Sequence, residues 1–194
     1  RPGEERPPGP GYPHIALAVS GGHTALYRVH APGEITQIAN TRDDAAGEAF
    51  DKVARMMGLG YPGGPVIERT ARGGDPTAYR FSMPRFKDGA LDFSFSGLKT
   101  AVLTALKNYE GPTELPEGQD QADLLASFQK SAVDQLVHRT VAAARAAGVK
   151  DVVLSGGVAC NSVLRDAMRH KLTSAAITLH VPPPRWCTDN AAMI

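Results

Sequence analysis

The 194-residue chain has little cysteine, almost no excess of either charge and no long hydrophobic run. Cys160 and Cys187 are its only thiols, which excludes a disulfide scaffold and a cysteine-based structural zinc site and suits a reducing cytoplasm. No stretch approaches the roughly 18 apolar residues of a membrane span, and the N-terminal residues lack the apolar core of a secretion signal. Because the net charge is +1, any contact with nucleic acid needs a local basic patch.

The order of strand and helix patterns predicts an α/β fold. Residues 1–13 combine proline, glycine and charge without periodicity, which predicts a disordered lead or linker before an ordered unit at 14–194. Three β-prone runs then predict an antiparallel meander, and helices alternate with strands after it. The expected strands are 15–20, 24–29, 34–39, 151–155 and 176–181. The expected helices are 46–57, 66–72, 96–107, a long one that Gly148 ends, one that buries Val163, Leu164, Ala167 and Met168, and one that starts at Thr188 or Asp189.

The sequence also predicts where helices begin and which segments are loops. Thr41 or Asp43 is expected to cap the helix that Gly58 ends, and Ser96 is expected to cap the helix that runs to Lys107. Residues 110–123 hold five acids and no Lys or Arg, which predicts a solvated loop. The long segment before Ser96 is rich in Gly, Pro and Arg and is typical of a functional insertion.

An apolar strand ends in Ser-Gly-Gly twice, at 15–22 and at 151–157. Glycine at a strand end lets backbone N–H groups approach a phosphate without a Cβ in the way. Each motif also fits an ordinary turn, the first a hairpin and the second a strand-to-helix connection. Together they favour nucleotide binding, although the chain has neither a P-loop nor a G-x-G-x-x-G turn.

Four acids, Asp43, Asp44, Glu48 and Asp51, lie just before and within the helix expected at 46–57. Asp43 and Asp44 suit the first turn, where acids complement the helix dipole. Asp51 lies mid-helix, where its carboxylate either accepts hydrogen bonds from a ribose or faces solvent.

Three further features have both a functional and an ordinary interpretation. The loop GYPGGP brings Gly63 and Gly64 close to a ligand or is a plain turn. Lys99, in the first turn of its helix, faces an anion or solvent. Two clusters of basic residues, one in 79–107 interleaved with aromatics and one in 165–171, have two interpretations. They either contact an RNA backbone or form solvated faces.

Residues able to bind metal do not form a complete site by spacing. The six histidines include no i, i+4 pair on a helix, and Asp189 is either one metal ligand or a helix cap. His23 is expected to be a hydrogen-bonding group of its loop. Cys160 has no recognisable His partner, so we do not expect a cysteine nucleophile.

Five co-linear motifs carry a family resemblance: AVSGGHT, DDAAGEAFDKVARMMGLGYPGGP, FSFSGLKTAV, LSGGVACN and CTDNAAMI. The set resembles the bacterial TsaD family of tRNA threonylcarbamoyladenosine transferases, formerly described as O-sialoglycoprotein endopeptidases. The resemblance implies an actin-like ATPase fold, shared with sugar kinases and Hsp70, of which this chain holds mainly the second lobe. It also implies an acyl transfer, from threonylcarbamoyl-adenylate to N6 of the adenosine next to the anticodon in tRNAs reading ANN codons.

The resemblance further implies cofactors, partners and site residues. It implies iron or zinc as the metal, threonylcarbamoyl-adenylate or ATP as the ligand, and a cytoplasmic location away from membranes. The implied partners are tRNA and proteins of the TsaB and TsaE type, with a TsaB-like interface that also suits a dimer. Asp189 resembles the carboxylate that ligates the metal. The implied substrate contacts are Val19, Ser20, Gly21, Gly22, His23, Asp51, Gly64 and Asn161.

One departure from the family pattern limits these expectations. The family's HxxxH pair of metal ligands, expected before the first Ser-Gly-Gly strand, is absent from residues 1–13. A single carboxylate binds a divalent metal weakly, and half a cleft leaves one side of a ligand in water. We therefore expect a fragment, truncated at both ends, that is inactive or nearly so alone. The alternatives are a non-catalytic lobe that binds nucleotide or a partner, and a phosphotransferase of the same superfamily; no motif supports a peptidase.

Overall fold

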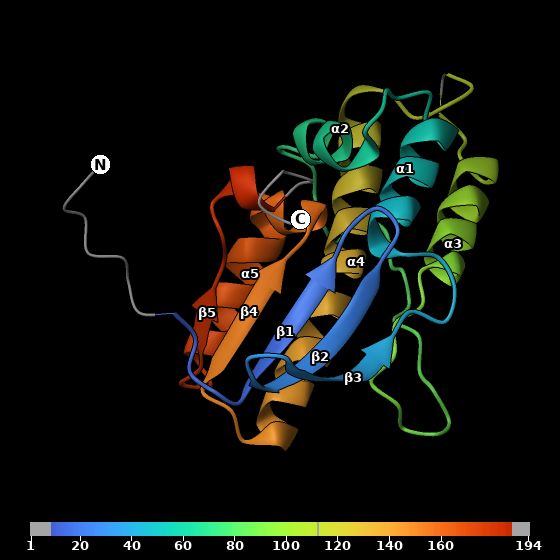
Figure 1. Ribbon diagram of the computed structural model, residues 1–194. Helices are drawn as coiled ribbons and strands as arrows, with labels where there is room; N and C mark the ends of the chain where they lie inside the picture. Colours follow the sequence, from blue (N-terminus) through green and yellow to red (C-terminus); the bar gives the residue numbers. More distant parts are fainter. Residues whose placement is uncertain (1–8, 112, 188–194) are drawn as a thin grey trace, which may run out of the picture.

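The core of the protein is a five-stranded mixed sheet in the order β3-β2-β1-β4-β5 (Figure 1). The computed structural model describes residues 9–111 and 113–187. The strands are β1 (His14–Val19), β2 (Thr24–Ala31), β3 (Glu34–Asn40), β4 (Asp151–Ser155) and β5 (Thr178–His180). β1 pairs antiparallel with β2 and parallel with β4. The meander and the α/β class predicted from the sequence are therefore confirmed.

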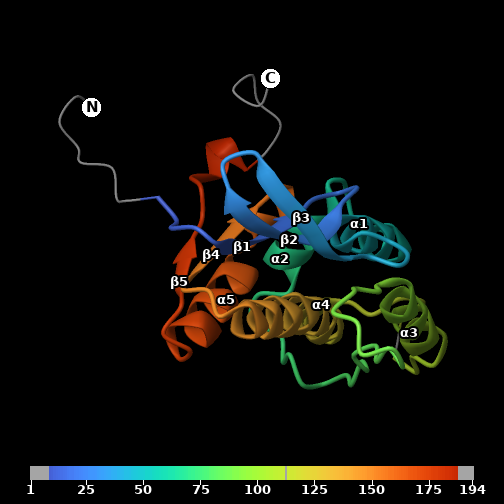
Figure 2. The ribbon, with the colours of Figure 1, turned by 60° about the horizontal axis from the view of Figure 1, so that its bottom comes forward.

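The five described α-helices lie on one side of this sheet (Figure 2). They are α1 (Ala46–Met56), α2 (Gly63–Thr70), α3 (Ser96–Lys107), α4 (Gly118–Ala147) and α5 (Ser162–Thr173), with short 3₁₀ turns η1 (Gly157–Cys160) and η2 (Pro184–Trp186). Alternate residues of β1, Ile15, Leu17 and Val19, are fully buried beneath the helices. Phe50 of α1 meets Phe128 of α4 edge to face at 5.0 Å. No described helix is both long and apolar enough to cross a bilayer.

Both predicted helix caps at 41–43 and 96 are wrong. The N-cap of α1 is Ala45, and the hydroxyl of Thr24 in β2 accepts a hydrogen bond from the N–H of Ala46 at 2.9 Å. Asp43 caps α3 instead, because its Oδ1 accepts hydrogen bonds from the backbone N–H of Phe95 at 2.7 Å and of Ser96 at 3.2 Å. Caps supplied across the fold leave no local sequence signal.

The long helix α4 starts earlier than predicted. Residues 118–123, expected in a solvated loop, form its first turns. These polar turns are held by contacts with another segment, since Gln119 Nε2 donates to the carbonyl of Gly73 at 3.3 Å and Asp123 Oδ1 accepts from the N–H of Asp75 at 2.7 Å. Gly148, with φ of 64°, ends α4 as predicted.

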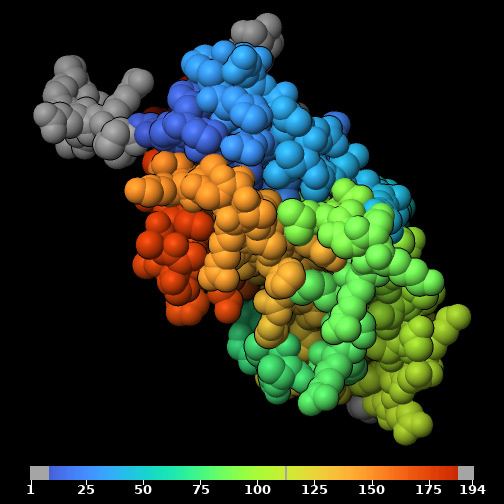
Figure 3. All heavy atoms as spheres, turned by 90° about the horizontal axis from the view of Figure 1, so that it is seen from below, coloured from blue at the N-terminus to red at the C-terminus, as the bar shows by residue number. Residues whose placement is uncertain are grey.

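The insertion before α3 lies along α4, and in Figure 3 its green segment runs beside the gold and orange atoms of the helix. Two buried polar side chains of α4 hold the insertion in place. Arg139 donates to the carbonyls of Pro84 at 2.8 Å and Ala90 at 3.1 Å. Gln135 accepts from the N–H of Ser94 at 2.8 Å and donates to its carbonyl at 2.9 Å. Buried side-chain amide and guanidinium groups thus satisfy backbone groups of the insertion, in addition to the backbone pairing of Phe93 with the end of β3.

Candidate functional site

The two Ser-Gly-Gly motifs lie side by side at one edge of the sheet. Ala18 of β1 is paired with Ser155 of the parallel strand β4, so both strands end together. Gly156 has a φ of 96°, and a Cβ at this position would lie 2.3 Å from the carbonyl oxygen of Val19. Only glycine allows this approach. The sequence repeat therefore corresponds to a pair of adjacent glycine turns.

The first glycine turn is a hairpin between β1 and β2. The backbone N–H of Ser20 donates to the carbonyl of His23 at 2.8 Å, and the N–H of His23 donates to Oγ of Ser20 at 3.1 Å. The hairpin interpretation is confirmed, whereas the expected hydrogen-bonding role of the His23 side chain stays a prediction, since only the backbone of His23 takes part in these bonds. Gly21 and Gly22 are exposed, and space is open where their Cβ atoms would be. A ligand can therefore approach the backbone of this turn closely.

A cavity of about 570 Å³ opens beside the two glycine turns. Four parts of the chain form its walls: the β1–β2 turn, α1, the start of α2 with the loop before it, and η1 with the start of α5. Its lining residues are Gly21, Gly47, Phe50, Asp51, Tyr61, Pro62, Gly64, Pro65, Glu68, Gly157, Val158, Cys160 and Asn161. The size is typical of a site for a nucleotide or another small molecule.

Asp51 lies on the cavity wall and is anchored to α2. Its Oδ1 accepts a hydrogen bond from the N–H of Gly63 at 2.7 Å, in the first turn of that helix. The backbone of Gly63 is packed directly on Asp51, because a Cβ on Gly63 would lie 2.7 Å from the Cα of Asp51. The carboxylate is thus held in place, and its oxygens can accept hydrogen bonds that ribose hydroxyls donate.

Asn161 is buried where η1 meets α5. Its Oδ1 accepts from the N–H of Leu164 at 2.9 Å, which makes Asn161 the N-cap of α5, and its Nδ2 donates to Oε1 of Gln129 at 2.9 Å. Both ends of the side-chain amide are therefore used within the fold. Asn161 still borders the cavity, where it shapes the wall and fixes the second glycine turn.

Sequence reasoning missed two prominent residues of this cavity. Glu68 of α2 accepts hydrogen bonds from both the N–H of Ser162, at 3.0 Å, and the Ser162 hydroxyl, which joins α2 to α5. A contact across 94 residues has no local pattern that could reveal it. Tyr61 is 84% exposed at the cavity rim, and its position in the GYPGGP motif was the available signal.

Lys99, which was expected to face an anion or solvent, is paired within the protein. Lys99 of α3 lies 3.8 Å from a carboxylate oxygen of Asp44. The start of α3 is occupied by the carboxylate of Asp43, so the anion at this helix terminus is part of the chain. Burial raises the pKa of Asp43, but hydrogen bonds from Ser94, Phe95 and Ser96 outweigh it and hold the pKa below its ordinary value.

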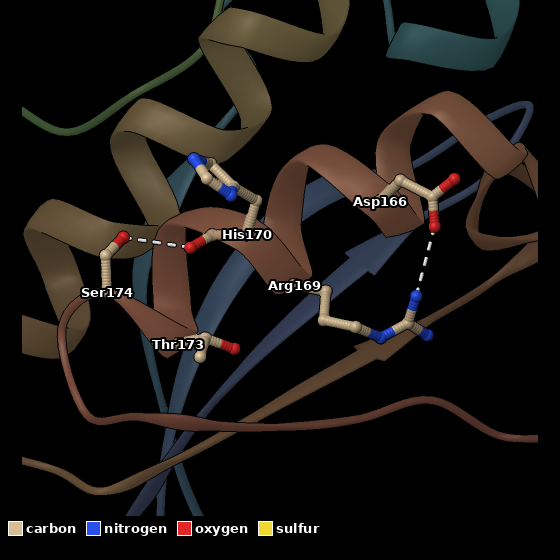
Figure 4. Close-up of a pocket in the computed structure, with 5 residues that line it drawn as sticks. All are labelled: Asp166, Arg169, His170, Thr173 and Ser174. Carbon is tan, nitrogen blue, oxygen red and sulfur yellow. Dashed lines mark hydrogen bonds and ion pairs between the residues drawn. The ribbon is translucent and has the colours of Figure 1, made fainter.

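A second hollow, of about 470 Å³, lies over α5. Figure 4 shows its five lining residues, Asp166, Arg169, His170, Thr173 and Ser174, all from this helix and its C-terminal end. Arg169 pairs with Asp166 at 3.0 Å, and Ser174 donates to the backbone carbonyl of His170 at 2.8 Å. The side chains point in different directions, so they form no converging set of groups.

The described residues do not form a metal site. Within 9–111 and 113–187, no three His, Cys, Asp or Glu side chains come together as ligands. Asp189, the predicted metal ligand, and the helix predicted to start there lie outside the described residues.

The sheet order, the helix layer and the paired glycine turns beside a nucleotide-sized cavity define a lobe of the actin-like ATPase fold. Solved structures share it: full-length HypF in a phosphate- and nucleotide-bound form has a TM-score of 0.68 at 13% identity, covering 91% of this chain and 37% of that one. HypF of T. kodakarensis has a TM-score of 0.58 at 22% identity, covering 82% and 19%. These likenesses concern the fold alone.

The chain belongs to the TsaD family, described as tRNA N6-adenosine threonylcarbamoyltransferase, whose sequence model matches residues 4–194. It is 55% identical over 183 residues to the tRNA N6-adenosine threonylcarbamoyltransferase of Geobacter sulfurreducens, covering 94% of this chain and 53% of that protein. It is 54% identical over 188 residues to the protein of the same name from Symbiobacterium thermophilum, covering 96% and 53%. The chain spans about half the length of the curated relatives it matches.

Proposed function

We propose that this chain forms the adenylate-binding half of a tRNA N6-adenosine threonylcarbamoyltransferase. The observation that carries the proposal is the meeting of Gly21, Asp51, Gly64 and Asn161, from four separate parts of the chain, on one cavity of about 570 Å³. All four are residues that the family resemblance selects as substrate contacts. The membership of the chain in the TsaD family supplies the chemistry.

Each wall of the cavity suits one part of threonylcarbamoyl-adenylate. The open backbone of Gly21 and Gly22 offers N–H groups to the phosphate, with Val19, Ser20 and His23 shaping that turn. The carboxylate of Asp51 accepts hydrogen bonds from the ribose hydroxyls. The apolar and aromatic side chains of Phe50, Tyr61 and Val158 provide surface for the adenine ring.

The proposed reaction is the transfer of the threonylcarbamoyl group to N6 of the tRNA adenosine. The N6 amine attacks the carbamoyl carbon, the bond from that carbon to the phosphate oxygen breaks, the amine loses a proton, and AMP leaves. The residues of this chain hold the adenylate in place and stabilise the charge of the departing phosphate through backbone N–H groups. Asp189 is proposed as a ligand of iron or zinc, which would polarise the carbamoyl oxygen, and no step here depends on the metal.

The proposed partners follow from the same assignment. The acceptor is tRNA, and proteins of the TsaB and TsaE type assist the reaction in the cytoplasm, with dimerisation through a TsaB-like interface. Of the basic residues in the insertion and α3, Arg80, Arg85, Lys87 and Lys107 remain candidates for the tRNA backbone, because Lys99 is directed at Asp44.

Calorimetric titration of the purified chain with ATP and with a stable threonylcarbamoyl-adenylate analogue tests the proposal. We expect saturable binding that Asp51→Ala abolishes and that Fe²⁺ or Zn²⁺ does not enhance. Absence of binding in a folded sample would overturn the assignment of the half-site. Turnover of ATP to transfer phosphate to a small alcohol would instead indicate a phosphotransferase, and we expect no threonylcarbamoyl transfer by this chain alone.

A further inference from the structure

The two thiols of the chain lie against one short stretch of backbone, and Cys160 also lines the cavity. Cys160 ends η1, and Cys187 directly follows η2. The sulfur of Cys160 lies 3.9 Å from the carbonyl oxygen of Pro184, and the sulfur of Cys187 lies 3.4 Å from that of Pro182. Two cysteines that are 27 positions apart in the sequence thus contact the same short stretch of backbone.

A third side chain connects the same two places. Arg165 of α5 donates through Nε to the carbonyl of Ala159, the neighbour of Cys160, and its Nη2 lies 4.0 Å from the sulfur of Cys187. Arg165 therefore joins the backbone next to Cys160 to the thiol of Cys187.

The two thiols differ in exposure in a way that suits a stepwise oxidation. Cys160 is exposed and lines the nucleotide-sized cavity, whereas Cys187 is 2% exposed. An exposed thiol meets an oxidant first, and a sheltered thiol beside it can then resolve the product. No part of the proposed acyl transfer uses either sulfur.

We propose that Cys160 and Cys187 are a redox modification site that closes to a reversible intramolecular disulfide. The oxidant is hydrogen peroxide. The sulfur of Cys160, after losing its proton, attacks one peroxide oxygen, the O–O bond breaks, and a sulfenic acid and one water form. The sulfur of Cys187 then attacks that of Cys160, its proton leaves with the hydroxyl as a second water, and the S–S bond forms. The thiols lose two electrons and two protons, and a dithiol reductant reverses the step.

A disulfide between Cys160 and Cys187 would connect two segments near the proposed site. Cys160 borders the cavity next to Asn161, the cap of α5, and Cys187 lies two positions before Asp189 in the sequence. The disulfide would tie the cavity wall to the segment that leads to the proposed metal ligand. This inference is independent of the proposed nucleotide site, because it concerns only the pair of thiols.

The test treats the reduced full chain with graded hydrogen peroxide at neutral pH and reads intact mass, titratable thiols and a peptide map. We expect the loss of two hydrogens, a fall from two thiols to none, a cross-linked peptide containing Cys160 and Cys187, and full recovery with a dithiol reductant. In Cys187→Ser, a sulfenic-acid trap should label Cys160. Oxygen addition without hydrogen loss in the wild type, or dimers linked between chains, would overturn the proposal. The peptide map is made on the wild-type chain, so it tests the proposal even if Cys187→Ser folds poorly.

Discussion

Oδ1 of Asp51 accepts a hydrogen bond from the backbone N–H of Gly63 at 2.7 Å, which joins the middle of α1 to the first turn of α2. The carboxylate lies on the cavity wall at the same time. A residue that anchors a helix and faces a ligand site affects both stability and binding when it is changed. The two effects separate only when the hydrogen bond and the charge are removed independently.

Asp51→Ala and Asp51→Asn make that separation. Asp51→Ala removes the acceptor of Gly63, so we expect a loss of about 0.5–2 kcal/mol in the free energy of unfolding, as for other helix caps. Asp51→Asn keeps an acceptor oxygen, so its stability should stay within about 0.5 kcal/mol of the wild type. Both variants should weaken ATP binding at least about tenfold, which corresponds to about 1.4 kcal/mol. Urea unfolding and calorimetry provide the two readouts, and wild-type affinity in Asp51→Asn would rule out a role for the charge.

Two cavity glycines should respond to alanine in opposite ways. A Cβ on Gly47 would lie 2.6 Å from the carbonyl oxygen of Ser20 and 2.7 Å from the Cα of Gly21, so Gly47→Ala should push the first glycine turn away and cost about 1–3 kcal/mol. Gly64 has nothing within 4 Å of a Cβ and lies in α2, so Gly64→Ala should gain about 0.5–1 kcal/mol.

Nucleotide affinity then separates the two roles of these glycines. Because Gly64 lines the cavity, Gly64→Ala should bind ATP more weakly than the wild type although it is the more stable protein. Thermal unfolding of both variants, followed by an ATP titration, checks the pair. A Gly64→Ala protein that binds ATP as well as the wild type would show that the ligand stays away from this part of the wall.

The sequence patterns were most informative where hydrophobic periodicity and glycine turns dominate. The meander, the span Ser96–Lys107 of α3 and the end of α4 at Gly148 follow from them. The substrate contacts assigned by family resemblance include residues that the fold brings to one cavity. Their role in binding stays a prediction.

The remaining features depend on contacts between distant segments. Asp43 was expected to cap its own helix and caps α3, because the insertion folds back and presents the N–H groups of Phe95 and Ser96 to it. The start of α4 was placed in a loop, since its anchors Gly73 and Asp75 lie more than 40 positions away. The link between Glu68 and Ser162 belongs to the same class. Local propensity contains no information about such pairs.

Tyr61 offers a test of where the base binds. At 84% exposed, its ring contributes little to the core, so Tyr61→Ala and Tyr61→Phe should both unfold at the wild-type urea concentration. If adenine stacks on this ring, Tyr61→Ala should weaken ATP binding by about 1 kcal/mol or more, and Tyr61→Phe should not. Ribose 5-phosphate, which has no base, should bind all three proteins equally. Equal losses for ATP and ribose 5-phosphate would contradict stacking.

Asp43 should make the stability of the protein depend on pH. Burial raises its pKa, but hydrogen bonds from Ser94, Phe95 and Ser96 outweigh it, so the pKa in the folded state is below that of the unfolded chain. A depressed carboxyl pKa stabilises the fold above the unfolded value, about 3.9, and this contribution is lost as the pH falls through the lower folded value. Asp43→Ala should therefore be less stable than the wild type at pH 7, by about 1 kcal/mol as for a lost cap.

The difference in the free energy of unfolding between Asp43→Ala and the wild type should become smaller as the pH falls below about 4. Protonation of Asp43 removes the same interaction in the wild type. Urea unfolding at a series of pH values from 7 to below 3 measures this difference. Asp166→Ala is the matched control: Asp166 is an exposed carboxylate paired only at the surface with Arg169 at 3.0 Å, and such pairs contribute little. Its difference from the wild type should stay near zero throughout. A gap for Asp43→Ala that does not change with pH would mean that the cap acts through its shape, and that its charge adds nothing to the connection between the β3–α1 turn and α3.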